Sequence, residues 1–359
     1  MTMQLEVNGK TYTGFKSCLA EKSIEAAAGT FCFTAVSASA LTLPIAKGDA
    51  CRVMVEGVPV ITGYIEKLEG KYDCGSHTMA VSGRDRTCDF IDSALPDGLE
   101  LAAGGTLRKV IKTIISEAGL TGVSVIDKVN DLKPFTTRDN ISGEVGEKCF
   151  AFAERYCRKR QALLTCDGNG NFVLTRASTT PIKTMLLNKT GGKQNNIKAA
   201  VWEDDDSRRY ASVTFKSQAN FSVTQDTVMD YSCTASDSAI RTSRNMVLMS
   251  DSASDLATLK KSAVWHINML RTHAKTYKCV VAGFTATADG VIWQPNMLVQ
   301  VQDDCAAVHG EMLVKAVRYS LENGASSLTK LTLVTPDAFT LEAQMSARES
   351  AANDVMGDE

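Results

Sequence analysis

The stretch that decides the fold is Gly63-Tyr64-Ile65-Glu66, followed further along the chain by Val81-Ser82-Gly83-Arg84-Asp85-Arg86-Thr87-Cys88-Asp89-Phe90-Ile91-Asp92. The same layout returns near the C-terminus, between Gly310 and Val334. Each copy opens with a glycine and an apolar strand, passes a turn that contains Gly75 or Gly324, and closes on a second alternating strand. The apolar strand positions are Ile65, Leu68 and 79–81 in the first copy, and Met312, Val314, Val317 and 328–333 in the second. One β-module near each end of the chain favours a role in assembly over one in catalysis.

Length and composition limit the class of protein. The 359 residues are enough for two or more domains, and the 44% apolar and 22% charged content is ordinary for a soluble globular protein. The formal net charge of -2 argues against a nucleic-acid binder that grips phosphates and against docking on anionic membranes. We therefore expect no sequence-specific nucleic-acid binding. No apolar run approaches the roughly 20 residues that span a bilayer, and residues 1–7 lack the features of a signal peptide. We therefore expect a protein made in a cytoplasm-like compartment, without stable membrane insertion.

Eleven cysteines lie singly along the chain, with no Cys-x-x-Cys pair and no cluster with histidine at zinc spacing. Several occupy apolar positions of predicted strands or helices, as Cys32 does between Phe31 and Phe33. Because no export signal is visible, we expect reduced thiols that pack as small hydrophobic side chains, not a disulfide framework.

Residues 1–93 are predicted to form an N-terminal β-barrel-like domain. Asn8-Gly9 marks the tip of a hairpin over residues 5–12, because this dipeptide is the strongest short hairpin signal. A strand is expected over 31–36 and a second hairpin over 52–61, and residues 95–98 mark the domain boundary.

Residues 94–183 are predicted to form an α/β domain with two helices and a hairpin. The first helix runs from Leu107 to Ala118, where apolar residues recur at spacings of three and four, and Gly119 ends it. The hairpin over 163–174 turns at residues 167–170. The second helix is expected to bury Val145, Cys149, Phe152, Ala153, Tyr156 and Cys157.

Residues 184–335 are predicted to form a second β-barrel-like domain with a helix inserted around 254–275. Strands are expected near Val280, over 293–301 and in the second copy of the module. The C-terminal tail, residues 336–359, has no clear apolar face, and we expect it to be mobile or ordered only against a partner. The predicted fold class is α+β, mainly β, with two similar small β-barrel-like modules flanking a helix-containing α/β middle region.

The sequence carries no common motif of an enzyme or a nucleotide-binding site. Asp85, Asp89 and Asp92 could share a helical face and serve in acid–base chemistry or cation binding. The favoured interpretation is that Asp85 caps a short helix and that the others are solvated or pair with Arg84 and Arg86. We therefore predict no enzyme, no catalytic or metal-binding residues and no cofactor.

Other polar side chains also have structural interpretations. The histidines, His77, His266, His273 and His309, are expected to be structural or to face solvent. The run Asp167-x-Asn169-x-Asn171 begins like a calcium loop, but Phe172 replaces the glycine that such a loop needs, so a hairpin turn is expected. The charged run 203–209 is expected to be a solvated loop or an ion-pair site between subunits. The tryptophans are too scattered for a sugar-binding platform, namely Trp202, Trp265 and Trp293.

These patterns resemble the Mu-like baseplate hub proteins of contractile-tailed bacteriophages. The resemblance rests on residues 23–31, on 62–66 together with 82–92, and on 292–299, with a weaker similarity over 106–176. The most specific part is Gly83-Arg84-Asp85-Arg86-Thr87. Cysteines are more frequent than is usual in the family, and the C-terminal tail has no counterpart in it.

The resemblance implies a homotrimer that forms a ring on the tail axis, in the baseplate of a virion assembled in the host cytoplasm. Three chains with two modules each would present six similar modules to a sixfold tail tube and three chains to a threefold spike. The implied partners are further copies of the chain, the central spike protein, tail tube or tube-initiator proteins, and baseplate wedge proteins. A near-neutral chain also suits a channel through which DNA passes without being held.

Two other functions stay open at this point. One is an envelope- or glycan-binding β-module of a tail, which needs exposed aromatic side chains although only 6% of the residues are aromatic. The other is a cell-wall hydrolase component, which needs a pair of carboxylates in a cleft or a Cys/His pair.

Overall fold

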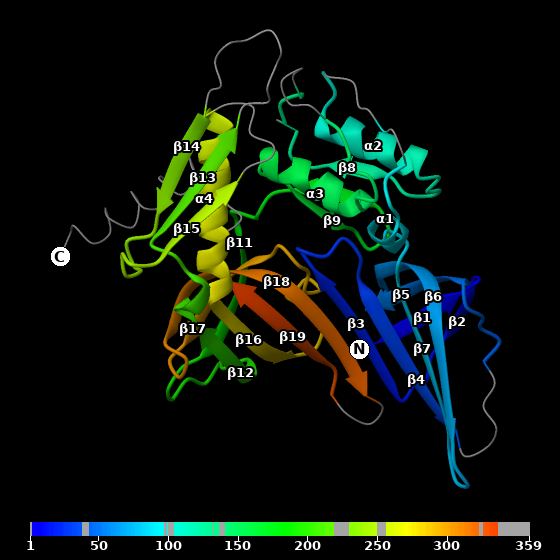
Figure 1. The fold of residues 1–359 in the computed structure, drawn as a ribbon. Coiled ribbons are helices and arrows are strands. Elements are labelled where there is room, and N and C mark those ends of the chain that lie inside the picture. Colours follow the sequence, from blue (N-terminus) through cyan, green and yellow to red (C-terminus); the bar gives the residue numbers. More distant parts are fainter. Residues whose placement is uncertain are drawn as a thin grey trace.

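The computed structural model describes residues 2–37, 43–96, 99, 104–130, 132–135, 141–218, 230–249, 256–322 and 326–336. Its strands, β1 to β19, outweigh its helices, α1 to α4 (Figure 1), so the predicted α+β, mainly β fold class is confirmed. Within the described residues, no helix combines the length and the apolarity that crossing a membrane requires.

The first module contains the strands β1 (Met3–Val7), β2 (Lys10–Tyr12), β3 (Ser17–Ser23), β4 (Thr30–Ser37), β5 (Ala50–Val55), β6 (Val58–Tyr72) and β7 (His77–Asp85). Asn8 and Gly9 join β1 to β2 with φ angles of 50° and 76°. Glu56 and Gly57 join β5 to β6 with φ angles of 49° and 76°. Two successive left-handed residues are what a two-residue hairpin turn needs. The hairpins predicted over 5–12 and 52–61 are therefore confirmed.

The middle region contains α1 (Cys88–Asp92), α2 (Leu107–Glu117), β8 (Val125–Asp127), α3 (Cys149–Lys159), β9 (Leu163–Cys166) and β10 (Phe172–Thr175). The hydroxyl of Thr106 caps α2 by accepting a hydrogen bond from the amide of Lys109. Both predicted helices and the hairpin are confirmed. The prediction that Val145 is buried is wrong: its side chain is 98% exposed, because α3 begins only at Cys149.

The last part of the chain contains β11 (Pro181–Asn188), β12 (Ile197–Asp204), β16 (Lys275–Ala282), β17 (Leu298–Asp303), β18 (Val308–Glu322) and β19 (Leu328–Val334). Between β12 and β16 lie the 3-10 helix η2 (Asp206–Arg208), β13 (Ser212–Gln218), β14 (Asp230–Ser236), β15 (Asn245–Met249) and α4 (Leu256–Ala274). The sequence predicted the inserted helix, but not that α4 packs on a separate sheet of order β14-β13-β15.

The two β-modules share one order of strands. The first module has the order β3-β4-β7-β6-β5-β1, and the second has β12-β16-β19-β18-β17-β11. Equivalent strands also follow one another in the same sequence along the chain, apart from the insertion after β12. The last pair differs, because β1 is antiparallel to β5 whereas β11 is parallel to β17. The sequence repeat is thus the visible part of a repeated module.

The alignment of the two copies that the sequence suggested needs one correction. Each long strand has one register shift against its hairpin partner, after Ile65 in β6 and after Val314 in β18. Aligning these shifts makes Gly63 equivalent to Met312 and not, as the sequence suggested, to Gly310. Other predictions lie outside the described residues: those for Gly324, for 97–98 of the boundary and for the tail from 337 onwards.

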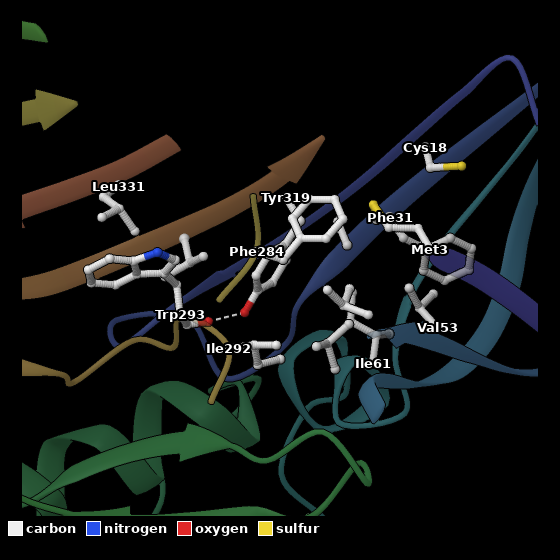
Figure 2. Packing of buried hydrophobic residues seen from close by; sticks show 14 of the residues in the cluster. Met3, Cys18, Phe31, Val53, Ile61, Phe284, Ile292, Trp293, Tyr319 and Leu331 are labelled. Carbon is white, nitrogen blue, oxygen red and sulfur yellow. Dashed lines mark hydrogen bonds between the residues drawn. The ribbon is translucent and has the colours of Figure 1, made fainter. Parts of the chain in front are cut away.

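One hydrophobic core runs through both modules and includes Phe33 and Ile61 from the first and Leu331 from the second. In Figure 2, Phe284 lies edge-on to Tyr319 with 5.8 Å between ring centroids, and the Tyr319 hydroxyl donates to the carbonyl of Trp293. The middle region has a core of its own. The domain limits 1–93, 94–183 and 184–335 stay predictions.

Candidate functional site: module junction and open sheet edges

The crossing of β6 and β7 is tight because both strands carry a glycine there. A Cβ atom on Gly63 would lie 1.9 Å from the carbonyl oxygen of Arg84, and one on Gly83 would lie 2.0 Å from that of Tyr64. The ring of Phe31 packs against Gly83 as well. No side chain fits at either position, and close backbone approach is what such strand glycines allow. The hairpin therefore depends on both glycines.

Arg84 points away from the core and ties the β6–β7 hairpin to α1. Its guanidinium donates to Oε1 of Glu66 and to Oδ2 of Asp92, both at 2.6 Å. The hydrogen bond from Arg84 lowers the pKa of Asp92, and the bonds to Glu66 and Asp92 raise the pKa of Arg84. The predicted pairing of Asp92 with Arg84 is confirmed. Because these side chains are partly exposed, the network orients α1 more than it stabilises the fold.

Asp85 is completely buried at the end of β7. Its Oδ2 accepts a hydrogen bond from the amide of Gly29 at 2.9 Å, and its Oδ1 accepts one from the amide of Thr62 at 3.0 Å. The thiol of Cys166 donates to Oδ2 at 3.3 Å. Burial raises the pKa of this carboxyl, whereas the nearby ammonium of Lys22 and the two amides act in the opposite direction. Asp85 thus fastens three segments that are distant in sequence.

The prediction that Asp85 caps a short helix is wrong. Strand β7 continues through Asp85, and α1 begins only at Cys88, so the carboxylate points into the sheet instead of along a helix. Asp89, by contrast, is exposed on α1. The three aspartates therefore do not share a helical face, and Asp85 has its oxygens occupied by the fold itself.

The last residues of the motif connect the first module to the middle region. Arg86 donates to the carbonyl of Gly122 at 2.8 Å, and its side chain lies so close to Gly170 that a Cβ there would be 2.6 Å from its Nε. Thr87 donates from its hydroxyl to the carbonyl of Ala27 at 2.5 Å. The segment Gly83–Thr87 is therefore a junction between the first module and the middle region.

A cavity of about 380 Å³ lies between α3 and α4. Arg155, Arg158 and Trp265 are among the residues that line it, with the Arg158 guanidinium 5.8 Å from the Trp265 ring centre. Its carboxylate, Glu147, is paired with Arg155 at 2.6 Å. Burial lowers the pKa of His266, which packs edge-on against Phe215. This is a basic and aromatic cavity, not the pair of carboxylates that a wall hydrolase needs.

The other residues that were considered as candidates from the sequence support the fold or face solvent. His77 stacks on Tyr72, and His273 lies 3.0 Å from Glu25. His309 is exposed in β18. Oδ1 of Asp167 accepts the amides of Asn169 and Asn171, each at 2.8 Å, as in an Asx turn, so the predicted hairpin turn is confirmed. Trp293 is buried.

The charged run 203–209 is only partly a solvated loop. Arg209 is 7% exposed and donates at 2.7 Å to Asp206 and to Asp237, which is itself buried. For Arg209 the prediction of a solvated side chain is therefore wrong, because the inserted sheet and α4 cover it. Glu203 and Asp204, at the end of β12, are exposed.

All eleven cysteines are unpaired in the structure, and seven of them are buried. Burial raises the pKa of the Cys51 thiol to about 12. Cys74 and Cys305 are exposed. The interpretation of most of these residues as small hydrophobic side chains is confirmed.

Among the open sheet edges of the described chain, those of β6 and β12 occupy the two ends of the strand path that links the modules. In β18, residues 308–313 pair with β17 and residues 316–322 pair with β3, a contact we call the in-chain joint. The equivalent part of β6, Lys67–Tyr72, pairs with β7 on one side, and no described strand lies on its other side. Strand β12 likewise pairs with β16 alone among the described strands. Figure 1 shows β12 and β6 on opposite sides of the two β-modules.

The open edges carry exposed apolar side chains. Tyr72 on β6 is 80% exposed, and Val201 and Trp202 on β12 are 67% and 50% exposed. Unpaired strands with large apolar side chains are templates for pairing with another chain. Sequence reasoning missed these edges, because nothing local distinguishes an open strand from a paired one.

Three models of baseplate domains match the chain in succession. Residues 2–85 match the N-terminal domain of the Mu phage baseplate assembly protein GpP-like family. Residues 87–176 match the second domain of the baseplate hub protein gp44-like family, and residues 256–342 match the fourth domain of the Mu phage baseplate assembly protein GpP. The matched segments together cover most of the chain.

Relatives match the chain over nearly its full length. It is 24% identical to baseplate hub protein gp44 of Escherichia phage Mu, over 99% of this chain and 93% of the relative. This coverage includes most of the C-terminal tail, so the expectation that the tail has no counterpart in the family is wrong. The 43 kDa tail protein of prophage MuSo2 from Shewanella oneidensis has a similar structure, with a TM-score of 0.82, 28% identity, and coverage of 94% of this chain and 99% of that one. A tail protein from Neisseria meningitidis MC58 matches with a TM-score of 0.81, 23% identity and the same coverage, which shows a common fold. With the repeated module, the junction motif and these matches together, the chain belongs to the Mu-like phage baseplate hub proteins.

Proposed function

We propose that three copies of this chain form a ring that joins a sixfold tail tube to a threefold central spike and lets DNA pass on ejection. The observation that carries the proposal is the strand path β12-β16-β19-β18-β3-β4-β7-β6, which contains two equivalent halves and has an open edge at each end. One chain thus offers two similar modules side by side.

The repeat supports a closed ring for a geometric reason. The in-chain joint connects two modules head to tail, since the long strand of one pairs with the first strand of the other. A head-to-tail contact repeated with a constant rotation generates either a ring or an open filament. Six modules from three chains give sixfold similarity to the tube and threefold symmetry to the spike. To close such a ring, each pair of neighbouring chains needs one contact of the same kind as the in-chain joint.

The face of the sheet turned away from the core suits a channel for DNA. Strand alternation places Glu21, Arg318 and Lys330 on this face, and Arg318 is paired with Glu21 at 2.7 Å. Arg84 and Glu66 form a similar pair in the first module. Glu21 and Glu66 neutralise Arg318 and Arg84, so these arginines offer phosphates little charge, whereas Lys330 and the neighbouring Lys278 add positive charge to the face.

On this proposal the chain works by shape and by its interfaces, without catalysis or a cofactor. Its partners are further copies of itself, the central spike, tail tube or tube-initiator proteins and baseplate wedge proteins. Its place is the baseplate of the virion, after assembly in the host cytoplasm.

The test is the mass of the purified chain by light scattering behind a sizing column, under reducing conditions and over a range of concentrations. A mass about three times the 38.6 kDa of one chain is expected. A complex with the spike protein should then show three copies of each chain. A monomer at every concentration, alone and with the spike, overturns the proposal.

A further inference from the structure

The in-chain joint is the template for a contact between the open edges of two chains. In this joint, β18 and β3 are antiparallel, and Tyr319 lies opposite Ala20. One residue further along, Arg318 lies opposite Glu21, and the two side chains form an ion pair at 2.7 Å. The pairing runs over seven residues of each strand. Any contact of the same kind between two chains would use the corresponding positions of β6 and β12.

The position in β6 that corresponds to Tyr319 follows from the two register shifts. Lys67 is the first paired residue after the shift in β6, and Ala316 is the first after the shift in β18. Counting three residues on from each makes Gly70 the equivalent of Tyr319.

The position in β12 that corresponds to Ala20 follows from the neighbouring strands. Across the first module, Ala20 pairs with Phe31 of β4, which pairs with Gly83 of β7. Across the second module, Trp202 pairs with Tyr277 of β16, which pairs with Leu333 of β19. Leu333 is the equivalent of Gly83, because each is the last paired residue before the register shift. Trp202 is therefore the equivalent of Ala20.

We propose that Lys67–Tyr72 of one chain pair antiparallel with the β12 strand of a second copy, in the register that puts Gly70 opposite Trp202. This inference rests on the proposed ring and specifies the contact that closes it. Because the ring repeats a head-to-tail contact, each chain gives its β6 edge to one neighbour and its β12 edge to the other.

Gly70 gives independent support for this register, because neither a close contact nor a backbone angle within the described chain requires a glycine there. A Cβ on Gly63 or Gly83 would clash with backbone, whereas one on Gly70 would have no atom of the described chain within 4 Å. Gly70 also lacks a left-handed φ angle. A glycine inside a strand weakens that strand. The indole of Trp202, half exposed in the single chain, would cover Gly70, and an aromatic residue opposite a strand glycine is a known way to stabilise such a site.

The neighbouring positions are consistent with this register. Tyr72, 80% exposed, falls opposite Ala200, a small residue on the same face as Trp202. Glu69 falls opposite Glu203, and like charges in direct opposition weaken a strand pair. Lys67 and Lys71 flank Glu69 and lie diagonally from Glu203, and Lys67 already contacts Glu69 at 2.6 Å in the single chain. The lysines therefore offset the acidic pair.

Cysteine cross-linking tests the register. The background carries Cys74→Ser and Cys305→Ser, which removes the exposed native thiols. Into it we would introduce Gly70→Cys together with Trp202→Cys, or as a control Gly70→Cys with Val201→Cys, whose side chain points to the other face of the sheet. After mild oxidation with copper phenanthroline, covalent dimers and trimers are read on a denaturing gel. Light scattering of the same samples gives the number of chains in each particle.

Covalent oligomers in the matched pair, with at least tenfold less in the control pair, support the register. An assembled trimer whose matched pair stays unlinked overturns the register and leaves the proposed ring standing. A monomer in every sample, including the unsubstituted chain, overturns the proposed function and this contact together. Equal linking in both pairs contradicts a fixed register.

A substitution that introduces no cysteine provides a second test of the contact. Trp202→Ala should leave the unfolding transition of the single chain nearly unchanged, and should raise the concentration needed for half-assembly roughly thirtyfold, as the loss of a central interface aromatic does. The matched control is Val247→Ala, which truncates another exposed side chain, 61% exposed, on β15. Assembly of Trp202→Ala at the wild-type concentration would contradict the proposed contact.

Discussion

The two β-modules have the same strand order, but only one of them uses its long strand fully inside the chain. Strand β18 of the second module pairs with β17, β19 and, in its second half, with β3. Strand β6 of the first module has β5 and β7 as partners, and its second half keeps an edge without a described strand. A duplicated module that makes one joint internally therefore retains one donor edge and one acceptor edge. Such a unit is suited to head-to-tail assembly.

A second difference concerns the crossing of the two hairpin strands. The first module has Gly83 where the second has Leu333, which is buried in the shared core. The glycine lets β6 and β7 approach closely, and the next residues, Arg84 to Thr87, then lead into the middle region. The first module thus gives up a core side chain where the chain has to turn towards a neighbouring domain.

The largest effect is expected from breaking this difference with Gly83→Val. The new side chain would meet the backbone of Tyr64, which cannot move without parting the strands. We expect the cooperative unfolding transition of the two β-modules, which share one core, to be lost, a cost above about 4 kcal/mol. Circular dichroism during urea unfolding measures it. The control, Leu333→Ala, should cost about 2–5 kcal/mol and keep a cooperative transition. A Gly83→Val chain as stable as this control would contradict the packing described.

Removing the buried carboxylate should have the next largest effect. Asp85→Ala leaves the amides of Gly29 and Thr62 buried without an acceptor, and each such group costs about 1–3 kcal/mol. The matched control is Asp92→Ala, which breaks an exposed ion pair with Arg84 and should cost less than about 1 kcal/mol. The free energies of unfolding in urea provide the comparison. Equal losses in the two variants would show that Asp85 does not hold the junction.

Charge reversal in each joint should separate folding from assembly. Arg318→Glu puts like charges opposite each other within the chain, so the free energy of unfolding should fall by about 1 kcal/mol. Lys71→Glu adds negative charge near Glu69 on an exposed edge, so stability should stay unchanged while assembly weakens roughly fivefold. Urea unfolding of the dilute chain and light scattering at increasing concentration measure the two effects. A stability loss from Lys71→Glu with normal assembly would reverse the roles of the joints.

A small effect of pH is expected in the inserted region. Burial lowers the pKa of His266 in the folded chain, so folding favours the neutral ring. The contribution of the neutral His266 ring to folding stability is complete at pH values above about 6.5, the pKa of histidine in the unfolded chain. This contribution is lost as the pH falls below that value, because the unfolded chain then binds the proton more readily than the folded chain. Between pH 7 and pH 5 the wild type should lose more stability than His266→Gln. Parallel pH profiles for the two proteins would contradict this.

Sequence reasoning located those features that depend on neighbouring residues. Asn8-Gly9 fixed a hairpin because two left-handed residues form its turn, and the apolar spacing from Leu107 fixed α2. The role of Asp85 could not be found in this way, because its partners Gly29, Thr62 and Cys166 come from three distant segments. The glycine alignment of the repeat failed for a related reason: register shifts in the sheet, not residue types, define which positions correspond.

The most direct test of the two joints is amide hydrogen exchange of the dilute chain and of the assembled form, read on peptides. The amides of β3 and of residues 316–322 should be protected in both states. In residues 67–72 and 200–204, the alternate amides that bond to β7 or β16 should be protected in both states, whereas those that face the open edge should exchange fast in the dilute chain and become at least tenfold slower on assembly. Assembly that leaves the exchange of these edge-facing amides unchanged, or their protection already in the single chain, would contradict the account.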